Sequence, residues 1–355
     1  MKENKKFDFI ILISVIFLIV FGLLNLYSVS KYLVVKQFFW DLLAIGAAIF
    51  VYFLKENLIK KLVIPLYIIS VVLLAAVLIF GTRVYGSIRW FRFFGLSFQP
   101  SELSKLSLIL MLSIIFVKKD LRSLFFSILV LAVPVFLILR EPDLGMSVLH
   151  VFVWFTMLLF SGISFKYILP IVGSGIGAIP IIYFFFLKDY QRARILSFLN
   201  PEKYAQGAAY NVIMSKNAVG SGGLLGRGYL ISPAVNGNYV PKMETDFIFS
   251  AIGEQFGFLG SILVLAAYLV IIIRVFSKMK DFKDNFWRLV SVGILSAFVF
   301  HVFENIGMNI GIMPVTGIPL PFLSYGGTST FIFGIMIGFL LKSLALVDKS
   351  RKVIL

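Results

Sequence analysis

Long, almost uninterrupted apolar runs are the feature that most limits how this chain can fold. A transmembrane α-helix needs about 20 predominantly apolar residues. Hydrophobic residues make up 60% of the 355 positions, against roughly 45–50% in soluble domains. We therefore expect an all-α integral membrane protein with about ten transmembrane helices, not a water-soluble enzyme, a disordered chain or a nucleic-acid-binding module. The runs fall at 9–26, 38–54, 62–80, 103–117, 123–139, 145–161, 167–187, 247–273, 289–306 and 330–346.

The distribution of basic residues predicts the orientation. Lys2, Lys5 and Lys6 precede the first run, which is too long for a signal peptide and has no small-residue cleavage site after it. An even number of spans places both termini on one side, and the loops on that side carry most of the Lys and Arg. The positive-inside rule then makes both termini cytoplasmic. The net charge of +16 fits basic loops that face anionic lipid.

Three long loops, 81–102, 188–246 and 307–329, are rich in polar, aromatic and glycine residues, and all three are predicted to face outward. The largest, 188–246, lies between the seventh and eighth helices. No internal repeat or soluble segment is evident, so residues 1–355 are expected to form one polytopic membrane domain. The chain has no cysteine, which excludes disulfides and thiolate chemistry. Its two histidines, His150 and His301, lie in apolar runs, and no metal site is expected from them.

The first outward cluster contains Arg89-Trp90 and Pro100-Ser101-Glu102. Proline followed by an acid is typical of a helix start, and Glu102 and Lys105, three residues apart, share a helix face. The pair can be a simple cap and ion pair. However, an unpaired lysine inside an apolar span costs about 2.5–3.5 kcal/mol, so Lys105 is also expected to face a polar cavity. Arg89-Trp90 is equally compatible with an interfacial anchor.

Two further loop segments contain candidate site residues, a positioning turn and a basic, glycine-rich segment. Glu141-Pro142-Asp143 is expected to be a helix-breaking turn whose acids cap the next span and position other groups. In the long loop, Arg194 and Lys216 precede a glycine-rich segment, Gly220–Gly228, that contains Arg227. Such a segment permits close backbone approach to an anion. No strand precedes it, so a plain flexible loop is an equal alternative.

Asp246 stands at the outer lip of the eighth span, before an aromatic run. A carboxyl at a low-dielectric boundary has a raised pKa, which suits a general base near neutral pH. A helix cap is the alternative. Glu254 and Glu304 lie inside apolar spans, where a carboxylate is either functional or held by an interhelical hydrogen bond.

The last outer loop, 313–329, contains three prolines and three glycines together with Ser324 and Tyr325. Non-helical backbone at membrane depth must be buried in protein or line a polar cavity, so a partly re-entrant wall is expected. Together the loops predict an outward polar pocket for an anionic, lipid-linked substrate that arrives sideways from the bilayer.

At this level of detail the motifs resemble those of the SEDS family (shape, elongation, division and sporulation proteins). The matching segments span nearly the whole chain in order. Phe198–Glu202 and the Gly220–Gly228 segment are more similar to the RodA-like elongation branch than to the FtsW-like division branch. The shared motifs are Arg89-Trp90, Gln99–Glu102 with Lys105, Glu141–Gly145, Thr245–Phe249 with Glu254, and Pro319–Pro321 through Tyr325–Gly327.

The resemblance implies a peptidoglycan glycosyltransferase that polymerises lipid II at the outer face of the cytoplasmic (inner) membrane, with a single-span class B penicillin-binding protein as its partner. It implies that Asp246 is essential and that Glu102 and Lys105 are important. A divalent cation, Mg²⁺ or Mn²⁺, is left open as a cofactor. One departure is evident: where the family usually has Pro-Glu-x-His before Thr-Asp, this chain has Lys242 and Glu244.

The expected reaction is inverting, with Asp246 as the single base. Lys105, Arg194, Lys216 and Arg227 are candidates to neutralise the departing pyrophosphate. Arg89, Trp90, Ser324 and Tyr325 complete the predicted substrate-binding set. A flippase for the same lipid, a non-catalytic scaffold and an FtsW-like polymerase remain the alternatives.

Overall fold

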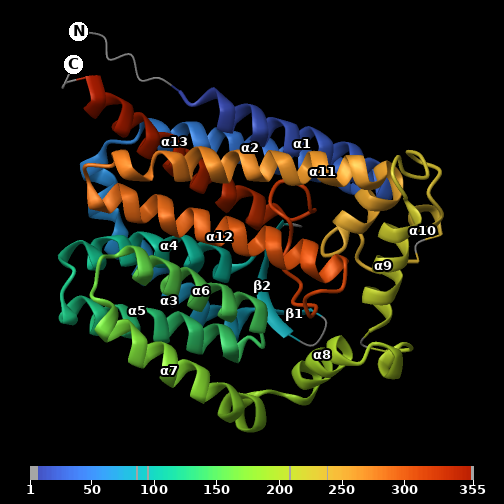
Figure 1. Cartoon of the computed structure of the whole chain (residues 1–355), viewed down its shortest axis with the longest axis horizontal. Coiled ribbons are helices and arrows are strands. Elements are labelled where there is room, and N and C mark those ends of the chain that lie inside the picture. Colours follow the sequence, from blue (N-terminus) through green and yellow to red (C-terminus); the bar gives the residue numbers. More distant parts are fainter. Residues whose placement is uncertain (1–6, 85–86, 94–95, 208, 238, 353–355) are drawn as a thin grey trace.

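Each predicted apolar run forms a helix in the computed structural model, which describes residues 7–84, 87–93, 96–207, 209–237 and 239–352 (Figure 1). The boundaries extend beyond the apolar runs at several ends, because polar residues continue the helices past the lipid-facing segments. The ten helices are α1 (Phe9–Val29), α2 (Lys31–Phe53), α3 (Glu56–Phe80), α4 (Pro100–Ile115), α5 (Leu121–Arg140), α6 (Leu144–Phe160), α7 (Phe165–Ile181), α11 (Ile248–Ser277), α12 (Asn285–Asn309) and α13 (Gly327–Lys352).

Within the described residues, eight of these helices are long and apolar enough to cross a membrane, and the chain is a multi-pass membrane protein. The other two, α6 and α7, have 17 residues each, and a short π-helical segment, Ile182–Phe186, follows α7. Helix α1 begins and α13 ends at the same end of the bundle (Figure 1), as an even number of crossings requires. Lys2, Lys5 and Lys6 lie outside the described residues.

Helices α4, α12 and α13 form the buried centre of the bundle, whereas α2 and α3 expose most of their apolar surface. Phe50 of α2 is 67% exposed and Ile79 of α3 is 76% exposed, which is expected where a helix faces lipid. Helix α2 packs closely on α13 through small residues. A Cβ added at Gly334 would lie 2.4 Å from the carbonyl oxygen of Ala44, so glycine allows this backbone approach.

The all-α prediction is incomplete in the first outer loop, where the structure has a small antiparallel sheet in the order β1-β2-β3. In its register, Thr82 pairs with Trp90 and Arg92 pairs with Ser97. The second strand contains Ile88, Trp90, Phe91 and Phe93, and β-branched and aromatic residues of this kind favour strands. The strands are β1 (Thr82–Val84), β2 (Ser87–Phe93) and β3 (Leu96–Phe98).

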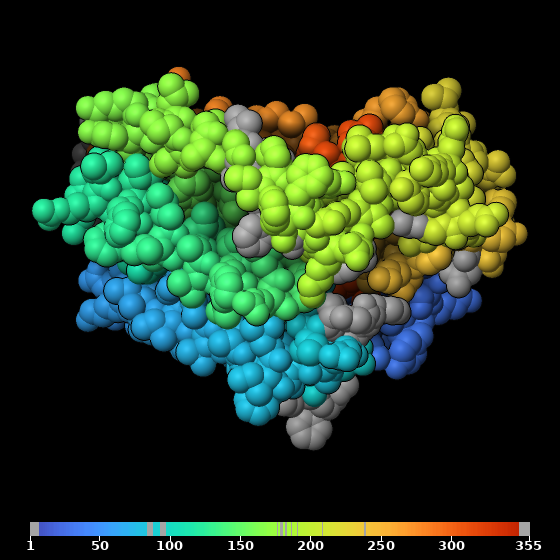
Figure 2. Space-filling view, turned by 90° about the horizontal axis from the view of Figure 1, so that it is seen from below, coloured from blue at the N-terminus to red at the C-terminus, as the bar shows by residue number. Residues whose placement is uncertain are grey.

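The long loop 188–246 is also more ordered than predicted, since much of it is helical. The yellow-green segment that contains α7 and α8 lies along one side of the molecule, with a hollow between it and the teal residues of the bundle (Figure 2). The elements of this loop are α8 (Asp189–Leu199), η3 (Glu202–Tyr204), α9 (Tyr210–Ser221) and α10 (Pro233–Asn236), and short 3₁₀ turns elsewhere are η1 (Phe116–Lys118) and η4 (Met279–Asp281).

The glycine-rich segment after α9 completes a break in α11 rather than forming an open loop. Gly257, inside α11, has φ +62°, a conformation that only glycine adopts freely. The break frees backbone groups, and the segment pairs with them: Arg227 N donates to Glu254 O (2.8 Å) and Phe258 N donates to Gly223 O (2.9 Å). The backbone of this segment is therefore hydrogen-bonded to α11. This differs from both predictions for it, an anion-binding segment and a flexible loop.

Candidate active site

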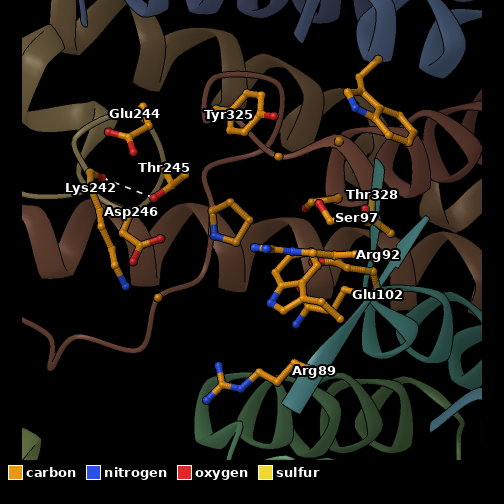
Figure 3. Close-up of a pocket in the computed structure, with 18 of the residues that line it drawn as sticks. Arg89, Arg92, Ser97, Glu102, Lys242, Glu244, Thr245, Asp246, Tyr325 and Thr328 are labelled. Carbon is orange, nitrogen blue, oxygen red and sulfur yellow. Dashed lines mark hydrogen bonds between the residues drawn. The ribbon is translucent and has the colours of Figure 1, made fainter. Parts of the chain in front are cut away.

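A pocket of about 1150 Å³ opens where β2, the start of α4, the loop before α11 and the segment before α13 meet (Figure 3). It mixes cationic, anionic and apolar side chains. Its polar lining residues include Lys36, Arg89, Arg92, Glu102, Lys188, Arg194, Lys242, Glu244, Asp246 and Tyr325, and its aromatic and aliphatic ones include Phe39, Trp40, Leu43 and Trp90.

Asp246 enters the pocket from a tight turn just before α11. Lys242 adopts a left-handed conformation (φ 57°), and its carbonyl oxygen accepts from the backbone N–H groups of Thr245 (3.2 Å) and Asp246 (3.1 Å). The turn thus projects the carboxylate across the pocket from the side opposite Arg92 and Glu102 (Figure 3). Asp246 does not cap α11, whose N-cap is Phe247.

Burial raises the pKa of Asp246 above its usual range. The positive charges of Lys242 and Arg194 oppose this rise in pKa, and the negative charge of Glu244 adds to it. Lys242 and Glu244 are the two departures from the family pattern, and both line the pocket beside Asp246. They therefore change the electrostatic surroundings of the predicted base, with opposite signs.

The predicted Glu102–Lys105 pair exists, with Lys105 Nζ 2.7 Å from Glu102 Oε2. Glu102 lines the pocket. Lys105 is only 1% exposed: its ammonium also lies 3.0 Å from His301 Nε2 and 4.2 Å from the centre of the Phe333 ring. The expectation that Lys105 faces a wet cavity is therefore wrong, because protein groups surround its charge. It can act on a pocket ligand only through Glu102.

His301, which sequence reasoning set aside, is the missed member of this group. Its Nδ1 lies 2.9 Å from the carbonyl oxygen of Pro319. A carbonyl can only accept, so Nδ1 carries the hydrogen and Nε2 accepts from Lys105. In the sequence, His301 is noticeable only as a polar side chain inside an apolar span. That pattern cannot identify Lys105, which is 196 positions away, as its partner.

Arg89 of β2 connects the pocket to the Glu141–Asp143 turn. Its Nε donates to Glu141 O (3.1 Å), Nη2 donates to Pro142 O, and Nη1 lies 3.2 Å from Asp143 Oδ2. Asp143 also caps α6 by accepting from Met146 N (3.1 Å), which confirms the predicted cap. The turn therefore positions a pocket arginine, as expected.

The carboxyl group of Glu141 lies behind this turn. It is fully buried, and neither oxygen has a hydrogen-bond partner among the described residues. Burial and the neighbouring Asp143 raise the pKa of Glu141 to about 9, against a smaller opposite effect from Arg89.

The structure divides the other predicted binding residues into two groups. Trp90, Arg194 and Tyr325 line the pocket, whereas Lys216, Arg227 and Ser324 are absent from its described lining. Arg227 is exposed, and its Nε donates to Ser221 O (3.0 Å). Lys216 is exposed on α9, with its alkyl chain against Gly311. Neither lies where a pyrophosphate in the pocket would be.

Ser324 has a supporting position instead. It is buried, and its hydroxyl donates to Thr245 O (2.6 Å) and accepts from Leu320 N (2.9 Å). Tyr325 N donates to Glu244 O (2.8 Å). These bonds attach the non-helical segment before α13 to the turn that carries Asp246. The predicted re-entrant wall thus has the expected irregular backbone, from Ile310 to Gly326.

Each of the two intramembrane acids of the sequence prediction accepts a hydrogen bond through one oxygen, and neither is part of the described pocket lining. Glu254 Oε1 accepts from Ala234 N (2.9 Å), and Glu304 Oε1 accepts from the hydroxyl of Thr316. No cluster of three or more His, Asp or Glu side chains suited to a metal ion occurs among the described residues. Glu102, Glu244 and Asp246 are the pocket carboxylates that a cation bound to substrate phosphates would approach.

Several pocket residues were not expected from the sequence. Arg92 and Lys188 add positive charge, and Lys36, Phe39 and Trp40 bring a face of α2 into the lining. The pocket residues of α2 precede Asp246 by more than 200 positions in the sequence, so no local pattern relates the two. Only the packing of α2 against α13 places them around one cavity.

Comparisons with known proteins identify the family. The model of a family of cell cycle proteins, FtsW/RodA/SpoVE, matches residues 5–348. The peptidoglycan glycosyltransferase MrdB of Escherichia coli K12 is 37% identical over 279 residues, covering 77% of this chain and 75% of MrdB. A probable peptidoglycan glycosyltransferase FtsW of Trichlorobacter lovleyi is 34% identical over 366 aligned positions, covering 95% of this chain and 93% of that protein.

Solved structures have the same fold. A chain from a peptidoglycan synthase complex superposes with a TM-score of 0.84 at 28% identity, covering 98% of both chains. The rod shape determining protein RodA of Thermus thermophilus superposes with a TM-score of 0.70 at 27% identity, covering 96% of this chain and 95% of RodA. The protein therefore belongs to the FtsW/RodA/SpoVE family of cell cycle proteins, the SEDS family that its motifs predicted.

Proposed function

We propose that this protein is a peptidoglycan glycosyltransferase that polymerises lipid II at the outer face of the cytoplasmic membrane, and that residues 1–355 act as one membrane domain. The observation that carries the proposal is the pocket itself. It contains a carboxylate with a raised pKa, Asp246, together with several cationic side chains, and part of its lining belongs to the lipid-exposed helix α2. The names of the related enzymes support the same activity.

The lining from α2 suits a lipid-linked substrate. Phe39 and Leu43 line the pocket and yet are 60% and 54% exposed on the outer surface of the bundle. A pocket bounded by such residues is continuous with the lipid-facing surface, so a polyprenyl chain can stay in the bilayer while its headgroup reaches the polar end. Lys36, also on α2, lies at the same border.

The chemistry follows from the two sides of the pocket. Asp246 takes the proton from the 4-hydroxyl of an acceptor N-acetylglucosamine, whose oxygen forms a bond to C1 of a donor N-acetylmuramic acid. The bond from C1 to the pyrophosphate oxygen breaks, and undecaprenyl pyrophosphate leaves. One base and no covalent intermediate give inversion at C1. The described pocket lining also contains Lys36 and Lys242, and we propose Arg89, Arg92, Lys188 and Arg194 as the cations that neutralise the developing charge of the leaving group.

A single-span class B penicillin-binding protein is the proposed partner. The support is the structural match to a chain of a complex described as coordinating polymerization and crosslinking. Within the family we propose the RodA-like elongation branch, on the basis of the motifs in 198–202 and 220–228. Relatives of both branches align well, so rescue of a RodA-depleted strain, compared with an FtsW-depleted strain, tests the branch.

The decisive experiment incubates the purified protein with lipid II, with and without its penicillin-binding partner. Glycan chains support the proposal. Translocation of the lipid without polymerisation indicates a flippase, and partner binding with neither activity indicates a scaffold. Asp246→Asn is expected to lower polymerisation by about 10²- to 10⁴-fold. The matched control is Asp189→Asn, which changes a fully exposed carboxylate on α8 and is expected to leave the rate unchanged.

A further inference from the structure

One face of α12 carries three polar residues at four-residue intervals: His301, Asn305 and Asn309. All three are fully buried. Residues at this spacing lie in a row along a helix. The three side chains reach backbone carbonyl groups of two different segments that border the pocket. We call this row the α12 polar row.

Asn305 makes the central contacts of the row. Its Nδ2 donates to the carbonyl oxygen of Asp246 (3.0 Å) and to that of Ile318 (2.8 Å). Ile318 lies between Gly317 and Pro319, which line the pocket. One amide group therefore holds both the backbone of the predicted base and the backbone of the adjacent wall segment that contains Gly317 and Pro319.

Asn309 holds the same carbonyl from the next turn of the helix. Its Nδ2 donates to Asp246 O (3.0 Å), and its Oδ1 accepts from Ser250 N (2.9 Å). A backbone N–H can only donate and a carbonyl can only accept, so the orientation of this amide is determined by its partners. The Asp246 carbonyl thus has two donors, both from α12.

We propose that Asn305, supported by Asn309, is a positioning residue that sets the place of the Asp246 carboxylate relative to the pocket wall. The inference rests on the proposed function, since it concerns the base of that reaction. His301 extends the row to Pro319 and to Lys105, the partner of Glu102. Helix α12 thus relates two of the pocket carboxylates, Asp246 and Glu102, to one rigid helix. A base must be held close to its productive geometry, and a displacement of about 1 Å can lower a rate about 10²-fold.

The test compares Asn305→Ala, Asn305→Asp and Asn309→Ala in the complex with the penicillin-binding partner, by steady-state polymerisation of lipid II. We expect Asn305→Ala to lower kcat by about 10- to 100-fold with little change in KM. Asn305→Asp, which keeps the shape but turns an acceptor toward two carbonyl oxygens, is expected to be worse. Asn309→Ala is expected to be milder, because Asn305 still holds both Asp246 O and Ile318 O.

Two measurements separate positioning from a general loss of stability. Ser291→Ala is the matched control. Ser291 is also buried in α12, but it lies in the other half of that helix, where it bonds to Trp287 O and to Ser343 of α13. This substitution is expected to lower the melting temperature with kcat unchanged. In Asn305→Ala the acid limb of the pH–kcat profile is expected to move to lower pH, because a displaced carboxylate gains water.

The inference is overturned if the three asparagine variants show the same relation between melting temperature and kcat as Ser291→Ala. It is also overturned if Asn305→Ala keeps the wild-type kcat and pH profile. Should Asn305→Ala not fold, Asn309→Ala decides on the same criteria. Asp246→Asn, assayed in parallel, distinguishes the positioning role of Asn305 from the proposed role of Asp246 as the base. An inactive Asp246→Asn beside an unaffected Asn305→Ala contradicts only the positioning role, whereas an active Asp246→Asn contradicts the proposed base.

Discussion

Glu102 and Lys105 form a buried ion pair, 2.7 Å apart, in which only the glutamate borders the pocket. Lys105 is held from three sides by Glu102, His301 and Phe333. The lysine therefore acts as the counter-ion that keeps a carboxylate at the pocket surface. This arrangement differs from the sequence prediction, in which Lys105 could meet the substrate pyrophosphate directly.

Replacing Lys105 alone is expected to destabilise the protein more than replacing both partners. Lys105→Met leaves an uncompensated buried carboxylate, which costs about 3–5 kcal/mol, whereas Lys105→Met with Glu102→Gln removes both charges. Thermal unfolding in detergent measures the difference. The exposed pair Lys60–Asp284, 2.8 Å apart, is the control, and Lys60→Met is expected to cost under about 1 kcal/mol. Additive losses at positions 102 and 105 would contradict the coupling.

Substitutions of Lys242 and Glu244, which both precede Asp246 in the same turn, are expected to shift the acid limb of the pH–rate profile in opposite directions. The base acts only when deprotonated, so activity falls as pH drops through its pKa. Lys242→Gln removes a charge that lowers the pKa of Asp246, and the limb should move to higher pH. Glu244→Gln removes a charge that raises it, and the limb should move to lower pH. Shifts of the same sign in both variants would refute this account.

The cations of the long loop are expected to differ sharply in importance. Arg194 lines the pocket, and Arg194→Gln should lower kcat/KM for lipid II by about 10²-fold, as for the loss of a group that stabilises developing charge. Arg227→Gln and Lys216→Gln remove the same charge outside the described pocket lining and should stay near wild type. Steady-state polymerisation assays of the three variants test this difference. Equal losses of kcat/KM in all three would show that the leaving group extends beyond this pocket.

The buried Glu141 is expected to make stability depend on pH. Its pKa is raised to about 9 when folded, whereas an unfolded glutamate ionises near 4.3. The unfolded state therefore binds fewer protons between these values, and stability falls as pH rises across this range. Glu141→Gln should flatten the dependence and add on the order of 4 kcal/mol at pH 7, at about 1.36 kcal/mol for each pH unit above 4.3. Melting temperatures from pH 5 to 9 test it, with the exposed Glu202→Gln as control.

The helix break at Gly257 is expected to tolerate no side chain. An alanine there has an unfavourable positive φ, and its Cβ would lie 2.4 Å from Gly226 N, so we expect a loss of at least about 2 kcal/mol. Gly220→Ala is the matched control, because it lies in α9 with nothing within 4 Å of the added Cβ. Thermal unfolding of the two variants tests the pairing of this segment with α11, and an unchanged melting temperature for Gly257→Ala would contradict it.

The sequence alone determined the membrane class, the positions of the ten long helices and the motifs that identify the family. Long apolar runs have one stable outcome in a bilayer, because a helix satisfies its own backbone hydrogen bonds. Local patterns also predicted the Glu102–Lys105 pair and the Asp143 cap, since both depend on residues three positions apart.

Only the tertiary structure decided which charges meet in the pocket. Arg227 and Asp246 belong to the same loop, yet the break at Gly257 holds the Arg227 segment against α11 and away from the cavity. Trp40, His301 and Asn305 join the site or its support from helices far away in the chain. Such contacts depend on how helices pack and where backbone carbonyl groups lack partners, and neither property is encoded in the spacing of residues along one segment.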